Sequence, residues 1–423
     1  MQAETPYATI PVDPIRCAII GFGGYGRFHL RRLFEFEKHG DIKLVAAFTR
    51  DPAEAPEEYK RLLANGCSVF TDINALFREF SGNLDICLVC TSTCSHKAFT
   101  TAALQAGAHV FVEKPVTACI QEAHEMKELG RRENRFIVVG MQIIHAPEIQ
   151  EMKKFLHQGG IGKLLRFKGV GLWPREDNYY KRNDWAGTLR TQDGWTLDSP
   201  ITNGLSHFLH LMLFLAGSTP TSTAFPDQLL AETYRSRRVG YYDTGFLRLV
   251  TDNAIEVYYA ATHYCRNHHN PLLIAEGSDG HMVVKMSDKY GNGFCRVSPR
   301  SGEAFDLPMP THQQLQRNMM DSLFAHFRDR SKFVCTVDSA MAHTLCINGI
   351  YESSDVADLG HDFGSNKDSV SAEEINPEEV EVAVRACFEK ASLPSELGYR
   401  WAKSGTWVDL AGYNHFPTRQ VEA

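Results

Sequence analysis

The sequence predicts an α/β dinucleotide-binding domain at its N-terminal end, followed by an α+β domain built on a large sheet. Three observations carry this prediction. Apolar strand-like runs alternate with helix-like segments over residues 15–140, and a glycine cluster at residues 21–26 separates the first strand from the first helix. After residue 160 the runs alternate apolar and polar residues, which is typical of a sheet with one covered face.

The elements of the first domain follow from apolar periodicity and turn residues. Strands are expected at 15–20, 41–48, 68–70, 84–90, 108–112 and 135–140, and helices at 24–38, 52–65, 96–106 and 118–133. Strands separated by helices of this length form βαβ units, and the right-handed crossover rule then gives a doubly wound parallel sheet. In the second domain, strand-like runs stand at 164–173, 244–252, 254–264 and 281–286.

Length and charge exclude several classes of protein. The chain has 423 residues, which suggests two or three domains at roughly 150 residues each. Its net charge of −7 argues against a nucleic-acid partner, because such proteins neutralise phosphates with Lys and Arg. No apolar run is long enough to span a bilayer, and the N-terminus lacks the pattern of a signal peptide, so we expect a cytoplasmic protein.

The 11 cysteines do not predict disulfides or a metal site. An odd number fits a reducing compartment. The one C-x-x-C pair, Cys87 and Cys90, lies in an expected strand, where residues three apart point to opposite faces. We therefore expect no metal.

The glycine cluster has the spacing of a nucleotide-binding turn. Gly21-Phe22-Gly23-Gly24-Tyr25-Gly26 satisfies G-x-G-x-x-G between a strand and a helix. The first glycine permits the tight turn, the second allows close approach of a pyrophosphate, and the third brings the helix close to the sheet. An ordinary glycine-rich turn is the alternative, but the βαβ context favours nucleotide binding.

The end of the second strand bears on which nucleotide binds. Folds that prefer NAD place a carboxylate there, on the ribose 2′-hydroxyl. Here Thr49 occupies that position and Arg50 follows. A hydroxyl and a guanidinium suit a 2′-phosphate better than a carboxylate would. In the alternative, Arg50 stacks on adenine and Asp51 turns to the ribose. The sequence favours NADP over NAD and leaves both open.

Two further motifs lie where the fourth and fifth strands end, the edge at which such sheets bind ligands. They are Thr91-Ser92-Thr93-x-x-His96 and Glu113-Lys114-Pro115. A lysine at this edge is well placed to meet a substrate, although a lone lysine in a turn is more often a surface residue.

With these motifs the chain resembles the Gfo/Idh/MocA oxidoreductase family. The resemblance also rests on Gly159-Gly160-Ile161-Gly162, Asn203-Gly-Leu-Ser-His207, Glu276-Gly277 and Ile350-Tyr-Glu-Ser353, and it covers roughly residues 13–355. It implies a Rossmann domain and a C-terminal domain with a large open, mainly antiparallel sheet. It also implies a homo-oligomer, a dimer or tetramer, formed through the exposed face of that sheet. The alternative is a monomer whose sheet is capped by the C-terminal tail.

The resemblance assigns catalytic roles. The family uses the lysine of its E-K-P motif with an Asp and a His four residues apart on a helix, where they share one face. Lys114 and His207 match, and Asn203 replaces the Asp. An amide can orient a hydroxyl but cannot hold a proton. His210 stands where the family often has another Asp. Both histidines have the alternative of being core imidazoles on the apolar helix 205–217.

The resemblance implies further contacts, which complete the expected site. Cofactor contacts are expected at Gly21, Phe22, Gly23, Gly24, Tyr25, Gly26, Thr49, Arg50, Thr91, Ser92, Thr93, His96, Glu113, Lys114 and Gln142. Substrate contacts are expected at Lys114, His145, Trp185, Asn203, His207 and His210. The aromatic and charged segment 173–185 suits a polyhydroxylated ligand, although it could equally be a surface loop.

We therefore predict hydride transfer between a nicotinamide and a carbinol carbon of a sugar, inositol or sugar derivative. His207 would act as the base and Lys114 would stabilise the oxygen. The alternatives are a redox-neutral, NAD-dependent glycoside-cleaving enzyme and a sensor without catalysis. The expected domains are 13–141, which binds the dinucleotide, 142–360, which binds substrate and forms the oligomer, and 361–423, a tail that packs on the fold without chemistry of its own.

Overall fold

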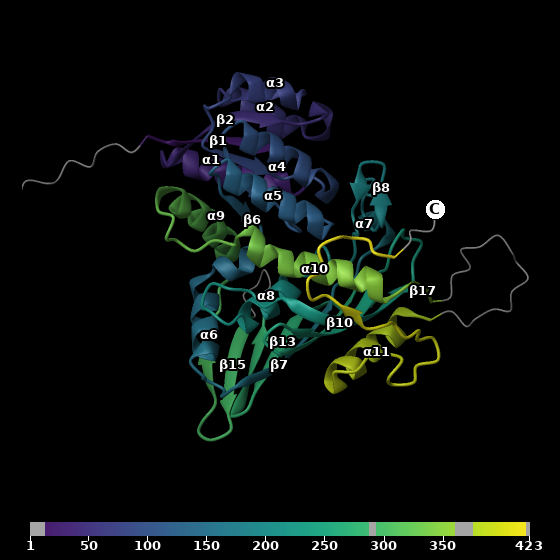
Figure 1. The fold of residues 1–423 in the computed structure, drawn as a ribbon. Helices are drawn as coiled ribbons and strands as arrows, with labels where there is room; N and C mark the ends of the chain where they lie inside the picture. Colours follow the sequence, from purple (N-terminus) through teal and green to yellow (C-terminus); the bar gives the residue numbers. More distant parts are fainter. Residues whose placement is uncertain (1–12, 287–292, 360–374, 420–423) are drawn as a thin grey trace, which may run out of the picture.

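The computed structural model describes residues 13–286, 293–359 and 375–419. Two sheets organise the chain (Figure 1). The N-terminal domain lies on one side of the molecule, the larger sheet lies on the other, and helices from the second half of the chain run between them. The predicted fold class is confirmed.

The first domain is a six-stranded parallel sheet with the order β3-β2-β1-β4-β5-β6. Its central strands β1 and β4 are apolar except for Arg16, because helices cover both faces. The strands are β1 (Ile15–Ile20), β2 (Ile42–Phe48), β3 (Ser68–Phe70), β4 (Ile86–Val89), β5 (His109–Val112) and β6 (Ile137–Val139). The helices are α1 (Gly26–Lys38), α2 (Pro56–Ala64), α3 (Ile73–Glu79), α4 (His96–Gln105) and α5 (Ile120–Arg132).

Several details of this domain differ from the sequence prediction: the predicted helix 52–65 is divided into the short helix η1 (Pro52–Glu54) and α2, and the ends of other elements shift by one or two residues. Helix α1 begins at Gly26 rather than at residue 24, because the glycine turn runs to that point. Helix α3 was not predicted. It has only seven residues, too few to show a clear apolar period, and the Asp72 carboxylate starts it by accepting a hydrogen bond from the backbone N–H of Asn74.

The second sheet has the strand order β16-β15-β14-β13-β7-β12-β11-β10-β17, and β18 also pairs with β10. It is mainly antiparallel; β7 with β12 and β10 with β17 are the parallel pairs. The strands are β7 (Leu164–Leu172), β10 (Pro226–Arg235), β11 (Thr244–Thr251), β12 (Glu256–Thr262), β13 (His269–Gly277), β14 (Gly280–Lys285), β15 (Phe294–Pro299), β16 (Phe305–Leu307), β17 (Val356–Asp358) and β18 (Val408–Asp409).

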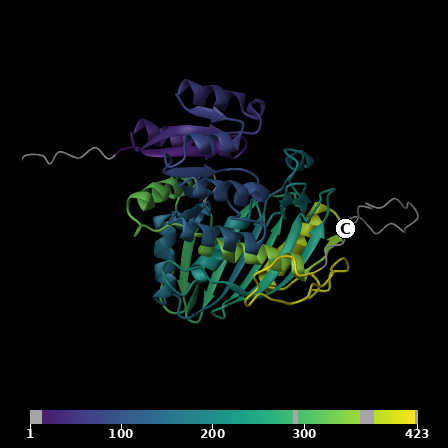
Figure 2. The ribbon, with the colours of Figure 1, turned by 45° about the horizontal axis from the view of Figure 1, so that its top comes forward.

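Three helices cover the inner face of this sheet, on the side of the N-terminal domain (Figure 2). They are α6 (Pro147–His157), α8 (Ser206–Ala216) and α10 (Val337–Ser353). Glycines bring α8 close to the strands: a Cβ at Gly169 would stand 2.8 Å from Met212, and one at Gly171 would stand 2.7 Å from Leu205. The inner face and these helices form one apolar core with the first domain.

One helix from the second half of the chain packs on the N-terminal domain. Met319, Met320 and Leu323 of α9 (His312–Arg328) share an apolar cluster with the buried residues of β1 and α1. Phe324 also meets Phe36 of α1 at a ring-centroid distance of 4.9 Å. The predicted domain boundaries remain predictions, but α9 ties the two halves of the chain together beside the glycine turn.

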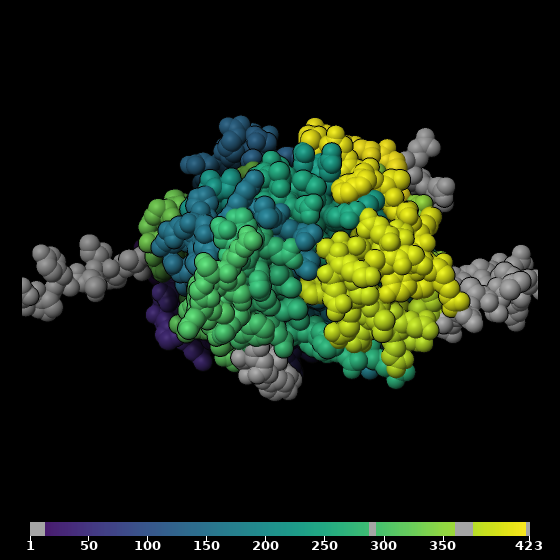
Figure 3. All heavy atoms as spheres, turned by 90° about the horizontal axis from the view of Figure 1, so that it is seen from below, coloured from purple at the N-terminus to yellow at the C-terminus, as the bar shows by residue number. Residues whose placement is uncertain are grey.

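The C-terminal segment covers part of the outer face of the large sheet. Val380, Val384 and Cys387 of α11 (Pro377–Lys390) pack on Val170 and Tyr258 of the strands. In Figure 3 this yellow segment covers one part of the face, and green strands remain visible beside it. The segment therefore occupies part of the surface on which the predicted partner subunit would dock, and the homo-oligomer remains a prediction.

Candidate active site

The carboxyl ends of β1, β4, β5 and β6 bring the sequence motifs to one edge of the first sheet. A Cβ at Gly26 would lie 2.1 Å from the Gly21 carbonyl oxygen, so α1 can start this close to the strand only with a glycine. Gly23 and Gly24 face open space. Phe22 points into the core, so it can offer a ligand only its backbone.

The start of α1 fits a dinucleotide pyrophosphate. Its first residue follows Tyr25, which makes no side-chain cap, and its first turn carries no acidic residue. The N–H groups of Gly26 and Phe28 donate to the carbonyl oxygens of Gly23 and Tyr25, and the positive end of the helix, with no acidic side chain in its first turn, favours an anion. The Tyr25 hydroxyl donates to Gln142 Oε1 at 3.3 Å, which brings two predicted cofactor residues together at the edge of the turn.

The residues after β2 surround the expected place of the adenosine ribose. The Thr49 hydroxyl donates to the Asp51 carbonyl oxygen, and the Asp51 carboxylate accepts from the Ala53 backbone N–H at 2.8 Å. Arg50 is exposed and forms an ion pair at 3.4 Å with Asp193. Asp193 lies in the turn of a hairpin formed by β8 (Arg190–Thr191) and β9 (Gly194–Trp195), so the second domain reaches Arg50.

The residues after β4 mainly hold the loop. Thr91 Oγ1 accepts a hydrogen bond from the Ser95 hydroxyl at 2.8 Å, and Ser92 Oγ lies 3.4 Å from the Ser95 hydroxyl oxygen. Thr93 begins the short helix η2 (Thr93–Ser95). The buried His96 ring contacts the carbonyl oxygens of Pro115 and Thr91, at 2.9 and 3.1 Å. His96 therefore joins the loop after β4 to the loop after β5.

The loop after β5 is fixed by a buried carboxylate. Glu113 Oε1 lies 2.6 Å from His29 Nε2 on α1, and Glu113 Oε2 accepts from the Lys114 backbone N–H at 2.9 Å. Because both oxygens are used in this way, Glu113 positions Lys114.

Lys114 reaches the second domain. Its Nζ donates to the backbone oxygen and to Oδ1 of Asn203, both at 2.9 Å. Burial lowers the pKa of the Lys114 ammonium, and Arg182 acts in the same direction, while Glu113 and Asp198 oppose the change. A lysine with a lowered pKa at a strand end suits proton transfer as well as charge stabilisation.

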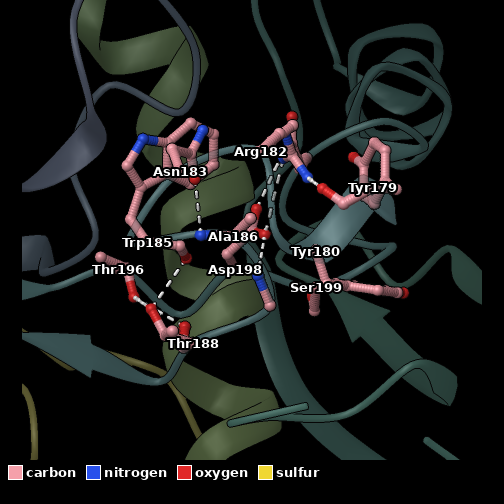
Figure 4. A network of polar contacts seen from close by, with 12 residues as sticks. Tyr179, Tyr180, Arg182, Asn183, Trp185, Ala186, Thr188, Thr196, Asp198 and Ser199 are labelled. Carbon is pink, nitrogen blue, oxygen red and sulfur yellow. Dashed lines mark hydrogen bonds and ion pairs between the residues drawn. The ribbon is translucent and has the colours of Figure 1, made fainter. Parts of the chain in front are cut away.

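Asp198, a buried carboxylate that was not predicted, supports Asn203. Figure 4 shows Asp198 beside Arg182 and Ala186. Asn203 Nδ2 donates to Asp198 Oδ1 at 2.9 Å, and Asp198 Oδ2 accepts from the Gly187 backbone N–H at 2.6 Å. Arg182 lies 4.0 Å from the same carboxylate. Burial raises the pKa of Asp198, which its hydrogen bonds oppose. Position 203 thus lacks a carboxylate of its own, but its amide is hydrogen-bonded to the carboxylate of Asp198.

The expectation that Asn203 and His207 share a helix face was wrong. Helix α8 begins at Ser206, and Asn203 lies in the turn before it, where its carbonyl oxygen accepts from the Ser206 hydroxyl. His207 stands in the first turn of α8 and is half-buried, and its Nδ1 has no hydrogen-bond partner among the described residues. Burial, and after it the charge of Lys114, holds the pKa of His207 well below its usual range. Its imidazole is therefore neutral.

The remaining predicted substrate residues lie apart from this centre. His210 is buried and contacts the Ser339 carbonyl oxygen on α10 at 3.1 Å, an arrangement that favours the alternative of a core imidazole. His145 is also buried and accepts from the Cys335 backbone N–H at 3.1 Å. Trp185 lies beside Arg182, with the guanidinium carbon 5.0 Å from its ring centre. Of the predicted substrate set, Lys114 contacts Asn203 directly, and His207 lies near enough for the Lys114 charge to lower its pKa.

Comparisons with known proteins agree with this fold. The fold and the strand-end site define a Rossmann-type dinucleotide-binding protein. Residues 15–141 match the family model described as an oxidoreductase family with an NAD-binding Rossmann fold. Over these residues the chain is similar to the Gfo/Idh/MocA family.

The relatives and solved structures cover different parts of the chain. A UDP-N-acetylglucosamine 3-dehydrogenase of Acidithiobacillus ferrooxidans is 30% identical over 35% of this chain and 42% of its own length. An inositol 2-dehydrogenase of Klebsiella pneumoniae is 26% identical over 48% and 54%. The chain thus spans about half the length of the curated relatives it matches.

The WlbA dehydrogenase from Bordetella pertussis, solved with NADH and UDP-GlcNAcA, has a similar fold. Its TM-score is 0.65 at 20% identity, and the match covers 80% of this chain and 95% of that one. A 3-ketoreductase from Actinomadura kijaniata, solved with NADP, gives 0.64 at 16% identity, with 82% and 99% covered. Both likenesses concern the fold.

Two absences complete the description. Within residues 13–286, 293–359 and 375–419, no group of three or more His, Cys, Asp or Glu side chains is placed to hold a metal ion. Within the same ranges, no helix is both long and apolar enough to cross a membrane.

Proposed function

We propose that the protein is an NAD(P)-dependent oxidoreductase that transfers a hydride between the nicotinamide and a carbinol carbon of a sugar, inositol or sugar derivative. The observation that carries this proposal is the position of Lys114. It extends from the dinucleotide-binding sheet to Asn203, and the neutral His207 imidazole stands one short turn beyond. The names of the relatives, inositol and sugar-nucleotide dehydrogenases, support the substrate class.

The bound nicotinamide supplies the hydride chemistry, and the residues of the chain manage the substrate oxygen. His207 takes the hydroxyl proton during oxidation, because its lowered pKa keeps it neutral. The Lys114 ammonium donates a hydrogen bond to the same oxygen and stabilises the charge that develops on it. Asn203 holds Lys114 in place by its hydrogen bond, and the Asp198 carboxylate behind Asn203 counters the lysine charge.

The function is tested by incubating the purified full-length protein with NAD or NADP and a panel of free sugars, inositols and sugar nucleotides. We expect a change in nicotinamide absorbance that depends on the polyol. Cleavage of a glycoside without net change in that absorbance would instead support the redox-neutral alternative. Failure of every polyol, together with no isotope exchange into any of them, would contradict both kinds of catalysis.

We further propose that NADP is the preferred cofactor. Arg50 is exposed where a 2′-phosphate would lie, and position 49, where folds that prefer NAD have a carboxylate, is a threonine. Arg50→Gln should raise the KM for NADP by about 10- to 100-fold, the usual effect of one charge-assisted hydrogen bond, and leave the KM for NAD nearly unchanged. Asp193→Asn should act in the opposite direction, because it frees Arg50 from its ion pair. Equal changes for both cofactors in Arg50→Gln would contradict the proposed preference.

A further inference from the structure

The hairpin of β8 and β9 extends from the second domain to the edge of the first sheet at which the dinucleotide is expected (Figure 1). At its tip, Asp193 Oδ2 lies 3.4 Å from Arg50 Nη1 in the loop after β2. The Thr191 hydroxyl lies 4.0 Å from Cys94 Sγ in the loop after β4. A Cβ at Gly194 would also stand only 3.8 Å from the Cβ of Cys94. The hairpin therefore contacts two separate loops of the N-terminal domain.

These two loops lie on either side of the glycine turn. The strand order β3-β2-β1-β4 puts β1 between β2 and β4, and β1 leads directly into the turn at residues 21–26. Such sheets bind a dinucleotide in the crevice where the strand order reverses, here between the ends of β1 and β4, with the adenosine ribose at the end of β2. Arg50 and the hairpin tip, residues 191–194, together bridge this crevice.

The base of the hairpin is held firmly, as Figure 4 shows around Thr188 and Thr196. The carbonyl oxygen of Thr188 accepts from the Asp198 backbone N–H at 2.9 Å and from the Thr196 hydroxyl at 2.6 Å. Trp195 packs against the ring of Phe416, with the two ring centres 5.1 Å apart. Because these contacts lie among buried residues, they fix the point from which the hairpin projects.

The tip of the hairpin is held much more weakly than its base. The side chains of Arg50 and Asp193 are 64% and 53% exposed, and an ion pair this exposed stabilises a contact little, because water screens it. The contact of 4.0 Å between Thr191 and Cys94 is long. The tip can therefore lift from the first domain while the base keeps its contacts.

We propose that the hairpin, residues 190–195, is a strap that closes over the adenosine half of the bound dinucleotide and controls its exchange. The proposal rests on the proposed function, because it needs a dinucleotide at this edge. Arg50 uses one terminal nitrogen for Asp193, which leaves its other N–H groups for a 2′-phosphate, so the strap closes over NAD or NADP alike. Lifting of the tip then limits the rate at which the cofactor leaves.

The first test locks the tip of the full-length protein with a disulfide. Thr191→Cys places a sulfur near Cys94 Sγ, and a small rotation of the side chains brings the two to the bond length of about 2.0 Å. The bond is formed with oxidised glutathione after NADH or NADPH has bound, verified by peptide mass spectrometry and reversed with dithiothreitol. Thr191→Cys/Cys94→Ser is the matched control, because it carries the same substitution and cannot form this bond.

Stopped-flow fluorescence of the reduced nicotinamide, displaced by excess oxidised cofactor, measures the rate constant of release. We expect the disulfide-linked protein to release NADH and NADPH at least about 10-fold more slowly than its reduced form. The control should release them at the same rate with and without reductant. Equal rates for the linked and reduced forms would overturn the strap and leave the proposed function standing. Failure of the wild type to bind either dinucleotide would contradict the proposed function, and the strap with it.

A second variant opens the strap without a new covalent bond. Asp193→Asn removes the charge that faces Arg50 and should raise the rate constant of NADH release by about two- to five-fold, the range that one exposed ion pair supplies. NADH is the probe because it has no 2′-phosphate to bind Arg50. Asp306→Asn is the matched control, because Asp306 forms an exposed ion pair with Arg296 on the large sheet. If the disulfide does not form, equal NADH release by these two variants overturns the proposal.

Discussion

Replacing Lys114 by alanine is expected to lower the rate of hydride transfer by about 10²- to 10⁴-fold, the usual contribution of a positioned acid or base. The substrate oxygen then loses the only ammonium that the structure places at Asn203 among the described residues. Cofactor binding should persist, because the glycine turn and the Glu113–His29 contact lie on the N-terminal domain and do not involve the lysine side chain. Single-turnover kinetics with the reduced cofactor measure the effect without product release.

His207→Ala should lower the same rate to a similar extent, and Lys97→Ala provides the matched control. Lys97 is a partly exposed lysine on the same domain, paired with Glu125. Its loss should leave the rate and the dissociation constant of the cofactor unchanged. If Lys114→Ala and His207→Ala both transfer hydride at near-normal rates with intact cofactor binding, these roles are wrong.

The pH profile gives an independent view of the same two residues. The pKa of His207 is lowered, mainly by burial, so oxidation should persist on the acid side to a lower pH than an ordinary histidine would allow. The pKa of Lys114 is lowered as well, so activity that needs its ammonium should fall on the alkaline side before an ordinary lysine would lose its proton. In Lys114→Arg the alkaline limb should move to higher pH, because a guanidinium stays charged.

The sequence predicted the first domain well because its signals are local. Each strand is an apolar run, and the glycine spacing at residues 21–26 is imposed by close contacts such as that of Gly26 with Gly21. Lys114 and His207 could be named because motifs carry them. Their neighbours could not, since contacts between distant segments leave no periodic pattern. Asp198 lies five residues before Asn203, outside the i, i+4 spacing of the family motif, and only the turn before α8 brings the two side chains together.

His207 and His210 show a second limit of prediction from the sequence. His210 and His207 lie three residues apart, and the sequence cannot say which ring faces the cleft. The structure places His207 in the first turn of α8, where its Nδ1 has no hydrogen-bond partner among the described residues, while His210 in the second turn meets Ser339 of α10. Asp198 is a carboxylate only five residues from Asn203, and this closeness in the sequence is a signal that could have identified it. No comparable signal in the sequence indicates that α9 packs on the first domain.

Exchanging the two residues of the Asp198–Asn203 pair should test whether the Asp198 carboxylate takes the role of the aspartate that is absent at position 203. Asn203→Asp alone sets two carboxylates against each other at the present contact of 2.9 Å. One must then take up a proton or move away, and Lys114 is displaced with it. Asp198→Asn alone leaves one amide oxygen for two donors, Asn203 Nδ2 and the Gly187 N–H. Each single variant should lower kcat by about 10- to 100-fold.

The double variant Asp198→Asn/Asn203→Asp should recover most of that loss, because the same hydrogen bond then runs in the opposite direction. The amide at position 198 would accept from Gly187 with its oxygen and donate with its nitrogen, and the carboxylate at position 203 would accept from both that nitrogen and Lys114. Recovery of this kind is a coupling between the two positions that independent damage cannot produce. Asn267→Asp, an amide beside the carboxylate of Glu381 on the outer face, should leave kcat unchanged. If the losses of the two single variants simply add in the double variant, then Asp198 only fills space behind Asn203, and its charge plays no part in positioning Lys114.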